Sequence, residues 1–143
     1  MNNVLKIKNL SKKYHTKEGE ILAIKDINME VNKGEFIALV GSSGCGKSTL
    51  LNIIANLDTS TTGTITMSED DFKIGYMFQS DCLFPWLTIY ENCLIGLKIQ
   101  KNNTKENQEY VLNLLKKYNL YDFKDKYPKS LSGGMKQRVA LIR

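Results

Sequence analysis

Gly41-Ser42-Ser43-Gly44-Cys45-Gly46-Lys47-Ser48 is the stretch that decides the fold of this sequence. It matches the pattern GxxxxGK[ST], which arises by chance in fewer than about one in a hundred chains of this length. An apolar run of strand length, Phe36 to Val40, precedes it, and the segment Thr49 to Asn56 has apolar residues at helical spacing. The sequence therefore predicts a strand, a glycine loop and a helix in that order.

The residue types in this loop suit the binding of polyphosphate. Its glycines let the backbone N–H groups of Gly44, Gly46 and Lys47 point inward, and the helix that follows adds its partial positive charge. We expect Lys47 to reach the β and γ phosphates of a nucleotide, the Ser48 hydroxyl to ligate Mg²⁺, and Thr49 to contact the α phosphate. The other loop residues assigned to an ATP site are Gly41, Ser42 and Cys45, the last as a spectator thiol at a variable position.

The length and composition of the chain exclude several classes of protein. The chain has 143 residues, 42% of them hydrophobic, which is enough for one globular domain. Its 20 basic and 15 acidic residues are spread along the chain without a basic stripe, so we expect no nucleic-acid partner. The three cysteines lack a CxxC pattern and fit a reducing cytosol. No apolar run approaches the roughly 20 residues needed to cross a bilayer, so any membrane role depends on partners.

The N-terminal half reads as strands. The groups Val4 to Leu10 and Ile27 to Val31 have near period-two spacing, which is typical of half-buried strands. A turn at Lys33-Gly34 separates them from the run Phe36 to Val40, which has the pattern of a strand covered on both faces. Two further short strands are predicted at Gly63 to Met67 and Lys73 to Phe78. They are joined by an acidic turn, Ser68 to Asp71.

The second half reads as helices. Thr88 with Glu91 forms a capping box that starts one helix, and Thr104 caps a second, which carries an apolar stripe and ends in two lysines. The segment Gly133 to Arg143 is a further helix, with no glycine or proline stop after it. We therefore predict an α/β domain over 1–143 with a helical insert at about 82–130.

A second motif narrows the function. The glycine loop alone leaves nucleoside kinases, GTPases, helicases and DNA-repair ATPases open. Leu131-Ser132-Gly133-Gly134-Met135-Lys136-Gln137-Arg138 resembles the LSGGQ signature of ATP-binding cassette (ABC) proteins, and its distance from Lys47 suits that family. It is another small-residue turn entering a helix, so Ser132 with the N–H groups of Gly133 and Gly134 offers a second anion site. The alternative is an ordinary helix start capped by Ser132.

The resemblance implies a P-loop NTPase of the ABC type, with an N-terminal antiparallel β part, a helical insert and a sheet left incomplete at the C-terminus. It implies ATP hydrolysis coupled to transport, with ATP and Mg²⁺ as cofactors. Leu131 to Met135 would contact ATP held by the opposite subunit, so the partner is a second copy or a paralogous ATPase. Permease subunits would hold the pair at the cytoplasmic face of the membrane, with an extracytoplasmic solute-binding protein as an indirect partner. Met135 stands where glutamine is more usual.

Three further positions are carried over from the family. Tyr14 is similar to the aromatic that stacks on adenine, the alternative being a strand-edge tyrosine. Gln79 is similar to the glutamine that contacts Mg²⁺ and the attacking water, the alternative being a polar residue that closes a strand. The stretch Phe84 to Asn92, with its Pro85-Trp86 pair, resembles the nitrate, sulfonate and taurine branch of bacterial importers, or else anchors the helical insert.

The match also has gaps. The aspartate and glutamate that organise metal and water in the family, and its switch histidine, have no counterpart in these 143 residues. We therefore expect weak Mg-ATP binding and negligible hydrolysis from this chain alone, together with uncovered apolar faces. A truncated, non-hydrolysing remnant and the ATPase of an exporter remain alternatives. A DNA-repair ATPase is disfavoured, because the short helical insert leaves no room for a long coiled coil.

Overall fold

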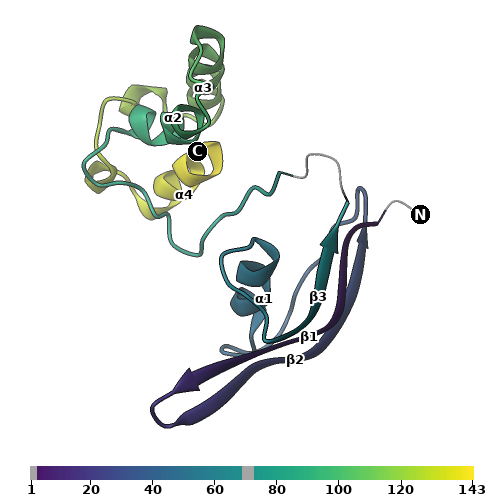
Figure 1. The fold of residues 1–143 in the computed structure, drawn as a ribbon. Helices are drawn as coiled ribbons and strands as arrows, with labels where there is room; N and C mark the ends of the chain where they lie inside the picture. Colours follow the sequence, from purple (N-terminus) through teal and green to yellow (C-terminus); the bar gives the residue numbers. More distant parts are fainter. Residues whose placement is uncertain (1–2, 69–72) are drawn as a thin grey trace. The chain divides into compact units, whose positions relative to one another are not determined.

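The computed structural model describes residues 3–68 and 73–143 and divides the chain into two compact units, Met1–Gly75 and Tyr76–Arg143 (Figure 1). Each unit has its own hydrophobic core. The first unit holds the glycine loop and the predicted strands, and the second holds the helices and the signature.

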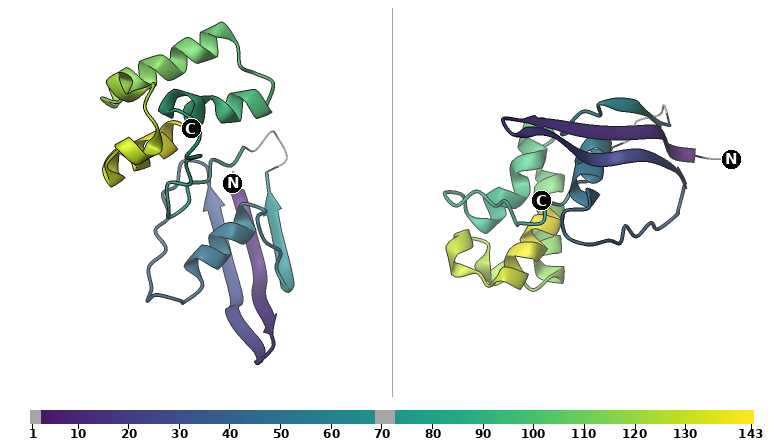
Figure 2. Two further views of the ribbon diagram at one scale, coloured as in Figure 1. Left: turned by 90° about the vertical axis from the view of Figure 1, so that its left-hand side faces the viewer. Right: turned by 90° about the horizontal axis from the view of Figure 1, so that it is seen from below.

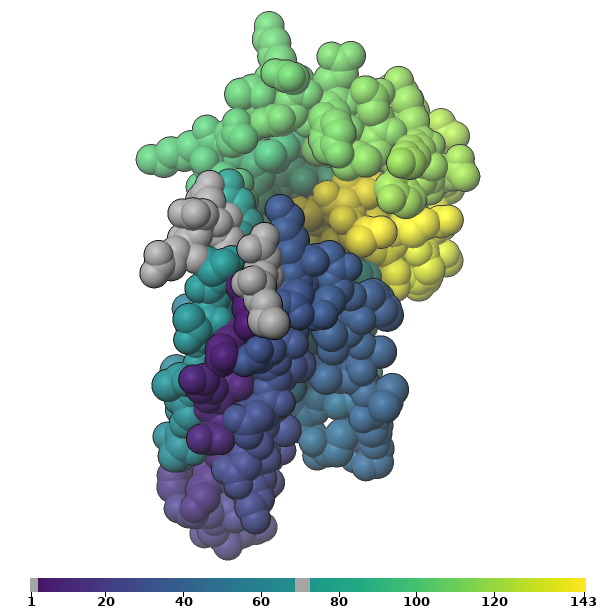
Figure 3. Space-filling model, turned by 90° about the vertical axis from the view of Figure 1, so that its right-hand side faces the viewer, coloured from purple at the N-terminus to yellow at the C-terminus, as the bar shows by residue number. Residues whose placement is uncertain are grey.

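A three-stranded antiparallel sheet forms the first unit. Its strands are β1 (Asn3–Thr16), β2 (Gly19–Asn32) and β3 (Thr62–Met67), in the order β2-β1-β3. Figure 3 shows the three strands side by side at the surface. The alternating apolar residues of the sequence are the cause, because every second side chain of a strand faces the same side. The antiparallel N-terminal part and the strand at 63–67 are confirmed.

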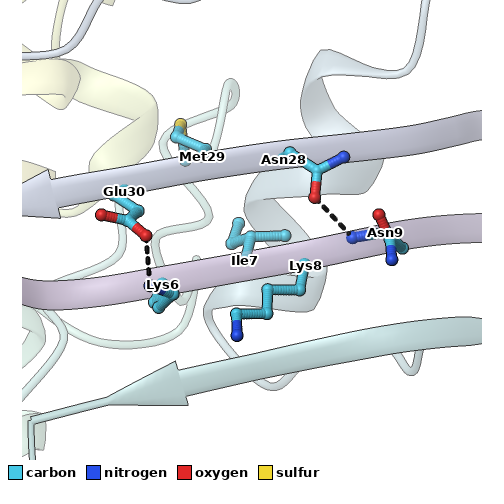
Figure 4. A pocket seen from close by; sticks show the side chains of 7 residues that line it. All are labelled: Lys6, Ile7, Lys8, Asn9, Asn28, Met29 and Glu30. Atoms are coloured by element: carbon cyan, nitrogen blue, oxygen red, sulfur yellow. Dashed lines mark hydrogen bonds and ion pairs between the residues drawn. The ribbon is translucent and has the colours of Figure 1, made fainter.

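A bulge in β1 keeps its apolar side chains on one face. The step from Ile7 to Leu10 spans three residues, whereas the paired step on β2 spans two. Asn9 takes up the extra residue with φ 48°, and its N–H donates to Asn28 Oδ1 at 2.9 Å (Figure 4). Asparagine tolerates this left-handed backbone better than most residues. Because of the bulge, Ile7 and Leu10 both reach the core despite their odd spacing.

Helix α1 (Lys47–Ile54) covers one face of this sheet (Figure 2). It begins two residues earlier than predicted. Its apolar side contributes Leu50 and Ile53 to the core of the unit. The buried members of that core are Leu5, Ile7, Leu10, Ile24, Leu50 and Ile53. The packing fixes the start of α1, and hence the glycine loop, against the sheet.

Two predicted strands are wrong. Neither Phe36 to Val40 nor Lys73 to Phe78 is a strand in the structure, and no described strand pairs with either. Phe36 is 93% exposed and Val40 is 90% exposed. A strand that is apolar on both faces needs a hydrogen-bonded neighbour and cover on each face. The described residues supply no strand neighbour to this run and only part of the cover, through Leu39, which packs against the core of the unit. The predicted acidic turn lies outside the described residues from position 69 to position 71.

The second unit is helical. Its elements are α2 (Ile89–Ile99), α3 (Lys105–Lys117), the short 3₁₀ helices η1 (Tyr121–Phe123) and η2 (Pro128–Ser130), and α4 (Gly133–Ile142). Its buried core is formed by Leu83, Ile89, Cys93, Leu94, Val111, Leu115, Leu120, Leu131 and Val139. Within the described part of the chain, no helix is both long enough and apolar enough to cross a membrane.

The predicted helix starts are confirmed by their caps. Thr88 Oγ1 accepts from the Glu91 N–H at 3.2 Å, and the Glu91 carboxylate accepts from the Thr88 N–H at 2.8 Å. Thr88 Oγ1 also donates to this carboxylate at 2.9 Å, and the two hydrogen bonds donated to it by the Thr88 backbone and side chain lower the pKa of Glu91 below its usual value. Thr104 Oγ1 accepts from the Asn107 N–H at 3.2 Å. Both caps satisfy N–H groups that a helix cannot pair internally.

A buried asparagine holds the loop before α2. Asn92 is 0% exposed, and its Oδ1 accepts from the Phe84 N–H at 2.8 Å. Its Nδ2 donates to the carbonyls of Phe84, Leu87 and Thr88 at 2.9 to 3.1 Å. One side chain therefore satisfies several backbone groups of the loop that carries Trp86.

Replacing Asn92 with alanine is expected to destabilise the second unit by about 2 to 4 kcal/mol. The reason is that backbone groups of Phe84, Leu87 and Thr88 would lose their hydrogen bonds to this side chain. Trp86 is the single tryptophan, so urea unfolding followed by its fluorescence reports on this unit. Asn107→Ala is the matched control. Among the described residues the Asn107 side chain donates to one carbonyl, Asn102 O at 2.8 Å, so its loss should lower the stability by less than about 1 kcal/mol. Equal losses in the two variants would contradict the prediction.

Candidate functional site

The glycine loop of the first unit lies directly before α1. Gly44 and Gly46 have φ values of 80° and 93°, which residues with a Cβ adopt only with strain. Gly46 occupies the N-cap position of α1, and its carbonyl accepts the first helical hydrogen bond, from the Leu50 N–H at 2.9 Å. A Cβ at Gly46 would lie 2.4 Å from the Ala23 carbonyl oxygen of β2. The backbone of the loop therefore rests against the sheet at a point where only glycine fits.

Lys47 is held by the loop that it follows. Its Nζ donates to the carbonyl oxygens of Gly41 and Ser42, each at 2.7 Å, and lies 3.4 Å from Cys45 Sγ. The ammonium thus lies at the loop, where a polyphosphate would bind. Anionic phosphate oxygens are stronger acceptors than neutral carbonyls, so a bound polyphosphate would take over these hydrogen bonds.

The next two residues lie on the first turn of α1. Ser48 is exposed and Thr49 is half-buried, so Ser48 is open to solvent directly after Lys47 in the chain. A cavity of about 220 Å³ lies beside the loop, and Cys45, Gly46 and Lys47 line it together with residues of β2. The structure thus brings the predicted phosphate residues, Ser48 and the helix start together, whereas Gln79, the other predicted metal residue, belongs to the second unit.

Tyr14 contacts two residues, Lys12 and Asp58, that were not predicted from the sequence to belong to a site. Its hydroxyl donates to Asp58 Oδ2 at 2.7 Å, and the Lys12 ammonium lies 4.8 Å from the centre of its ring. Lys12 Nζ also donates to Asp58 Oδ1 at 2.6 Å and to the Thr59 carbonyl at 2.7 Å. Hydrogen bonds from Lys12 and Tyr14 lower the pKa of Asp58 to about 2. We call Lys12, Tyr14 and Asp58 the Tyr14 cluster.

The signature lies at the start of α4 in the second unit. Ser132 is the N-cap residue, and its Oγ accepts from the Met135 N–H at 3.4 Å. Gly133 and Gly134 are exposed on the first turn, and nothing lies within 4 Å of a Cβ built on either one. Leu131 is buried, and Met135 packs on the core of the unit. An ordinary capped helix and an anion site require the same local geometry here, and this geometry is present.

Gln79 lies next to the same helix. Its carbonyl oxygen accepts from Gln137 Nε2 of α4 at 3.5 Å, and its side chain is exposed. Further along, the rings of Phe84 and Trp86 lie 5.3 Å apart, and Trp86 is 68% exposed. The second unit therefore combines Gln79, the signature and an exposed aromatic pair.

Sequence reasoning missed Lys12, Asp58 and Asn92. A signal for Lys12 was present, because it follows Leu10 by two residues on a strand and so points to the same, buried face. A buried charge needs a partner, which the sequence alone does not name. Asp58 and Asn92 carried no comparable signal, because their partners are set by the packing.

The described residues form a further hollow that is lined by none of the predicted site residues. A hollow of about 410 Å³ over β1 and β2 is bordered by Lys6 and Glu30, which form an ion pair (Figure 4). Hydrogen bonds from Lys6 and Asn3 and the charge of Lys6 lower the pKa of Glu30. In residues 3–68 and 73–143, no group of three or more His, Cys, Asp or Glu side chains is arranged to hold a metal ion.

The three cysteines are expected to differ in reactivity. Cys45 and Cys82 are exposed, whereas Cys93 is 2% exposed and burial raises its pKa to about 12. Because the thiolate is the reactive form, Cys93 should resist alkylation in the folded protein and react only after unfolding. Iodoacetamide labelling with peptide mapping by mass spectrometry measures this. Labelling of Cys93 at the rate of Cys82 under native conditions would show that the prediction is wrong.

Several known proteins are similar to this chain over nearly its whole length. The family described as ABC transporter matches residues 24–143. The nitrate import ATP-binding protein NrtD of Synechocystis is 44% identical, over 97% of this chain and 54% of its own length. The uncharacterized ABC transporter ATP-binding protein YtlC of Bacillus subtilis is 43% identical, over 97% of this chain and 55% of its own length. The chain thus spans about half the length of these curated relatives.

A solved structure has the same fold. The dimeric ATP-binding cassette MJ0796, in a post-hydrolysis state with ADP and Pi, matches with a TM-score of 0.84 and 36% identity. The match covers 96% of this chain and 67% of that chain. The predicted fold class is therefore confirmed, although the strand Phe36 to Val40 is not formed.

Proposed function

Because this chain belongs to the ABC transporter family, we propose that it is the nucleotide-binding part of an ATPase that drives transport through permease subunits. The observation that carries the proposal is the glycine loop. Gly44 and Gly46 have positive φ angles, and α1 begins at Lys47 with an ammonium already placed at the loop. Backbone N–H groups, a helix start and one lysine together form a polyphosphate site.

Each loop residue has a role in this proposal. Lys47 exchanges its two carbonyl partners for β and γ phosphate oxygens, and the Thr49 side chain, on the first turn of α1, contacts the α phosphate. Tyr14 stacks on the adenine base. The base and the triphosphate are thus bound by different elements, β1 and the start of α1.

Magnesium fits the residues present. Mg²⁺ retains several waters and is bound through few protein oxygens together with substrate phosphates, so a single hydroxyl is sufficient as a protein ligand in this loop. The exposed Ser48 hydroxyl on the first turn of α1 supplies it. Gln79 is the second residue that we assign to the metal and to the attacking water. When bound, the ion neutralises charge that develops on the phosphates.

The signature acts in a second subunit. Ser132 and the N–H groups of Gly133 and Gly134 offer donors at a helix start, which suits a γ phosphate. In the proposed dimer, these groups close on ATP that is bound by the glycine loop of the partner. The dimeric state of the MJ0796 cassette supports this arrangement. The proposed location is the cytoplasmic face of the membrane, against the permease.

The proposed cargo is a small oxyanion such as nitrate or a sulfonate, taken up with an extracytoplasmic binding protein. Its support is the Phe84-Pro85-Trp86 stretch, with Trp86 68% exposed, and the name of the NrtD relative. Uptake of labelled nitrate and taurine into vesicles that hold the whole ATPase and its permease would decide the cargo class. Transport of neither solute would overturn this part of the proposal alone.

Nucleotide binding is tested by calorimetric titration with three ligands in the presence of Mg²⁺. ATP and inorganic tripolyphosphate are both expected to bind. AMP is expected to bind at least about tenfold more weakly than ATP, because most hydrogen-bond donors of the loop are assigned to the β and γ phosphates, which AMP lacks. AMP that binds as tightly as ATP would overturn the proposal, as would a complete lack of ATP binding.

A further inference from the structure

Lys12 places a charge on a face of β1 that otherwise carries buried apolar side chains. It follows Leu10 on the buried face of β1 and is 8% exposed. Its ammonium is satisfied by Asp58 Oδ1 at 2.6 Å and the Thr59 carbonyl at 2.7 Å. The pair is partly buried, with 10% of the Lys12 side chain and 25% of the Asp58 side chain exposed, so the loss of hydration offsets part of the attraction between the charges. Besides the backbone of Thr59, whose N–H also donates to Asp58 Oδ1 at 2.7 Å, the pair contacts the side chain of Tyr14.

The pair restrains Tyr14 at two points. Asp58 accepts from the Tyr14 hydroxyl at 2.7 Å, which fixes the far end of the ring. The Lys12 ammonium lies 4.8 Å from the ring centre, which places a cation over the ring. Tyr14 is nevertheless 38% exposed, so part of the ring remains open to solvent. A ring that is fixed at its tip, flanked by a cation and still partly open is suited to stacking.

The cluster and the glycine loop are attached to the same pieces of backbone. Lys12 pairs with Ile24 of β2, and a Cβ at Gly46 would meet Ala23 and Ile24. Asp58 follows α1, and its N–H donates to the Asn52 carbonyl of that helix at 3.3 Å. Both ends of the α1 segment are thus anchored to the sheet, the first by the loop and the last by Asp58. The Tyr14 cluster and the glycine loop are thus both attached to β2 and to the α1 segment.

We propose that Lys12 and Asp58 are positioning residues that hold the Tyr14 ring ready for the nucleobase and so set the share of affinity that the base contributes. This inference rests on the proposed nucleotide-binding function. A side chain that is immobilised before binding loses less rotamer freedom when the base stacks on it. Freeing the ring should weaken ATP binding by about three- to tenfold and leave the binding of tripolyphosphate unchanged.

The test compares Mg-ATP with Mg-tripolyphosphate, which has no base, on the same protein preparations. Lys12→Met, Asp58→Asn and Tyr14→Phe are each expected to lower the ratio of ATP affinity to tripolyphosphate affinity by about three- to tenfold. Tyr14→Phe is the mildest change, because it keeps the ring and removes only the hydrogen bond to Asp58. Lys13→Met is the matched control. Lys13 is the neighbouring lysine, and its ion pair with Glu20 at 3.0 Å is exposed, so both affinities should stay as in the wild type.

A double-mutant cycle separates positioning from general damage. If Lys12 acts through the ring, Lys12→Met should have no effect on the affinity ratio in a Tyr14→Ala background. An unchanged ratio in all three single variants would overturn the inference, as would equal losses of ATP and tripolyphosphate binding. Wild-type protein that binds tripolyphosphate as tightly as ATP would overturn it while leaving the phosphate site intact. Binding of neither ligand would instead refute the proposed function itself.

Discussion

Replacing Lys47 with alanine is expected to weaken Mg-ATP binding by about ten- to a hundredfold, which corresponds to the roughly 1.5 to 3 kcal/mol of a charge-assisted hydrogen bond. Lys47 is the one loop residue with a full positive charge, and its Nζ already lies 2.7 Å from the Gly41 and Ser42 carbonyls. These carbonyls belong to exposed residues, so water can replace the ammonium and the stability of the fold should change little. Calorimetric titration with Mg-ATP measures the effect.

Lys17→Ala is the control for the loss of one positive charge. Lys17 lies in the exposed turn between β1 and β2, so its removal tests the general attraction between the protein and ATP. Its effect should be smaller than about twofold at physiological salt, since exposed charges are screened beyond about 8 Å. Equal affinities of wild type and Lys47→Ala would remove Lys47 from the phosphate site.

Gly46→Ala is expected to destabilise the first unit by about 2 to 5 kcal/mol, combining backbone strain with a steric overlap. The φ of 93° is unfavourable for alanine, and the new Cβ would lie 2.4 Å from the Ala23 carbonyl oxygen. The loop would have to move away from β2 and take the start of α1 with it. Hydrogen exchange of the α1 amides, measured by mass spectrometry, should therefore accelerate strongly.

Gly44→Ala separates the two causes. Gly44 has a similar φ of 80°, but nothing lies within 4 Å of its Cβ position. Only the strain applies there, about 1 to 2 kcal/mol, so hydrogen exchange in α1 should rise far less than in Gly46→Ala. If both variants accelerate exchange equally, contact with β2 is not what makes glycine necessary at position 46.

The elements that were predicted correctly from the sequence are those that are determined by residues close together in the chain. The caps at Thr88 and Thr104 and the alternating strands β1 and β2 depend on neighbouring residues, and all of them form. The run Phe36 to Val40 failed for the opposite reason. A buried parallel strand forms only with strands from distant parts of a sequence, and among the described residues nothing pairs with it. Apolar composition alone shows what a segment needs and not whether its neighbours are there.

In the candidate site, too, the residues of a local motif were predicted, and the residues that meet only through packing were not. Gly44, Gly46 and Lys47 were identified because a short motif fixes their spacing, and the structure places them in one loop. Lys12 and Asp58 are 46 positions apart, and they meet only because β1 and the end of the α1 segment are packed together. No local pattern contains that information.

The bulge at Asn9 has a consequence for how this strand can vary in evolution. Because the extra residue is accommodated at Asn9, deleting it would leave Leu10 and Lys12 facing the core, whereas a deletion between Leu10 and Lys12 would turn Lys12 outward. The bulge also restricts which residue fits at position 63, because a Cβ built on Gly63 would lie 2.5 Å from the Asn9 carbonyl oxygen. A gap at position 9 would remove this overlap, whereas the φ of 86° at Gly63 would still favour glycine there.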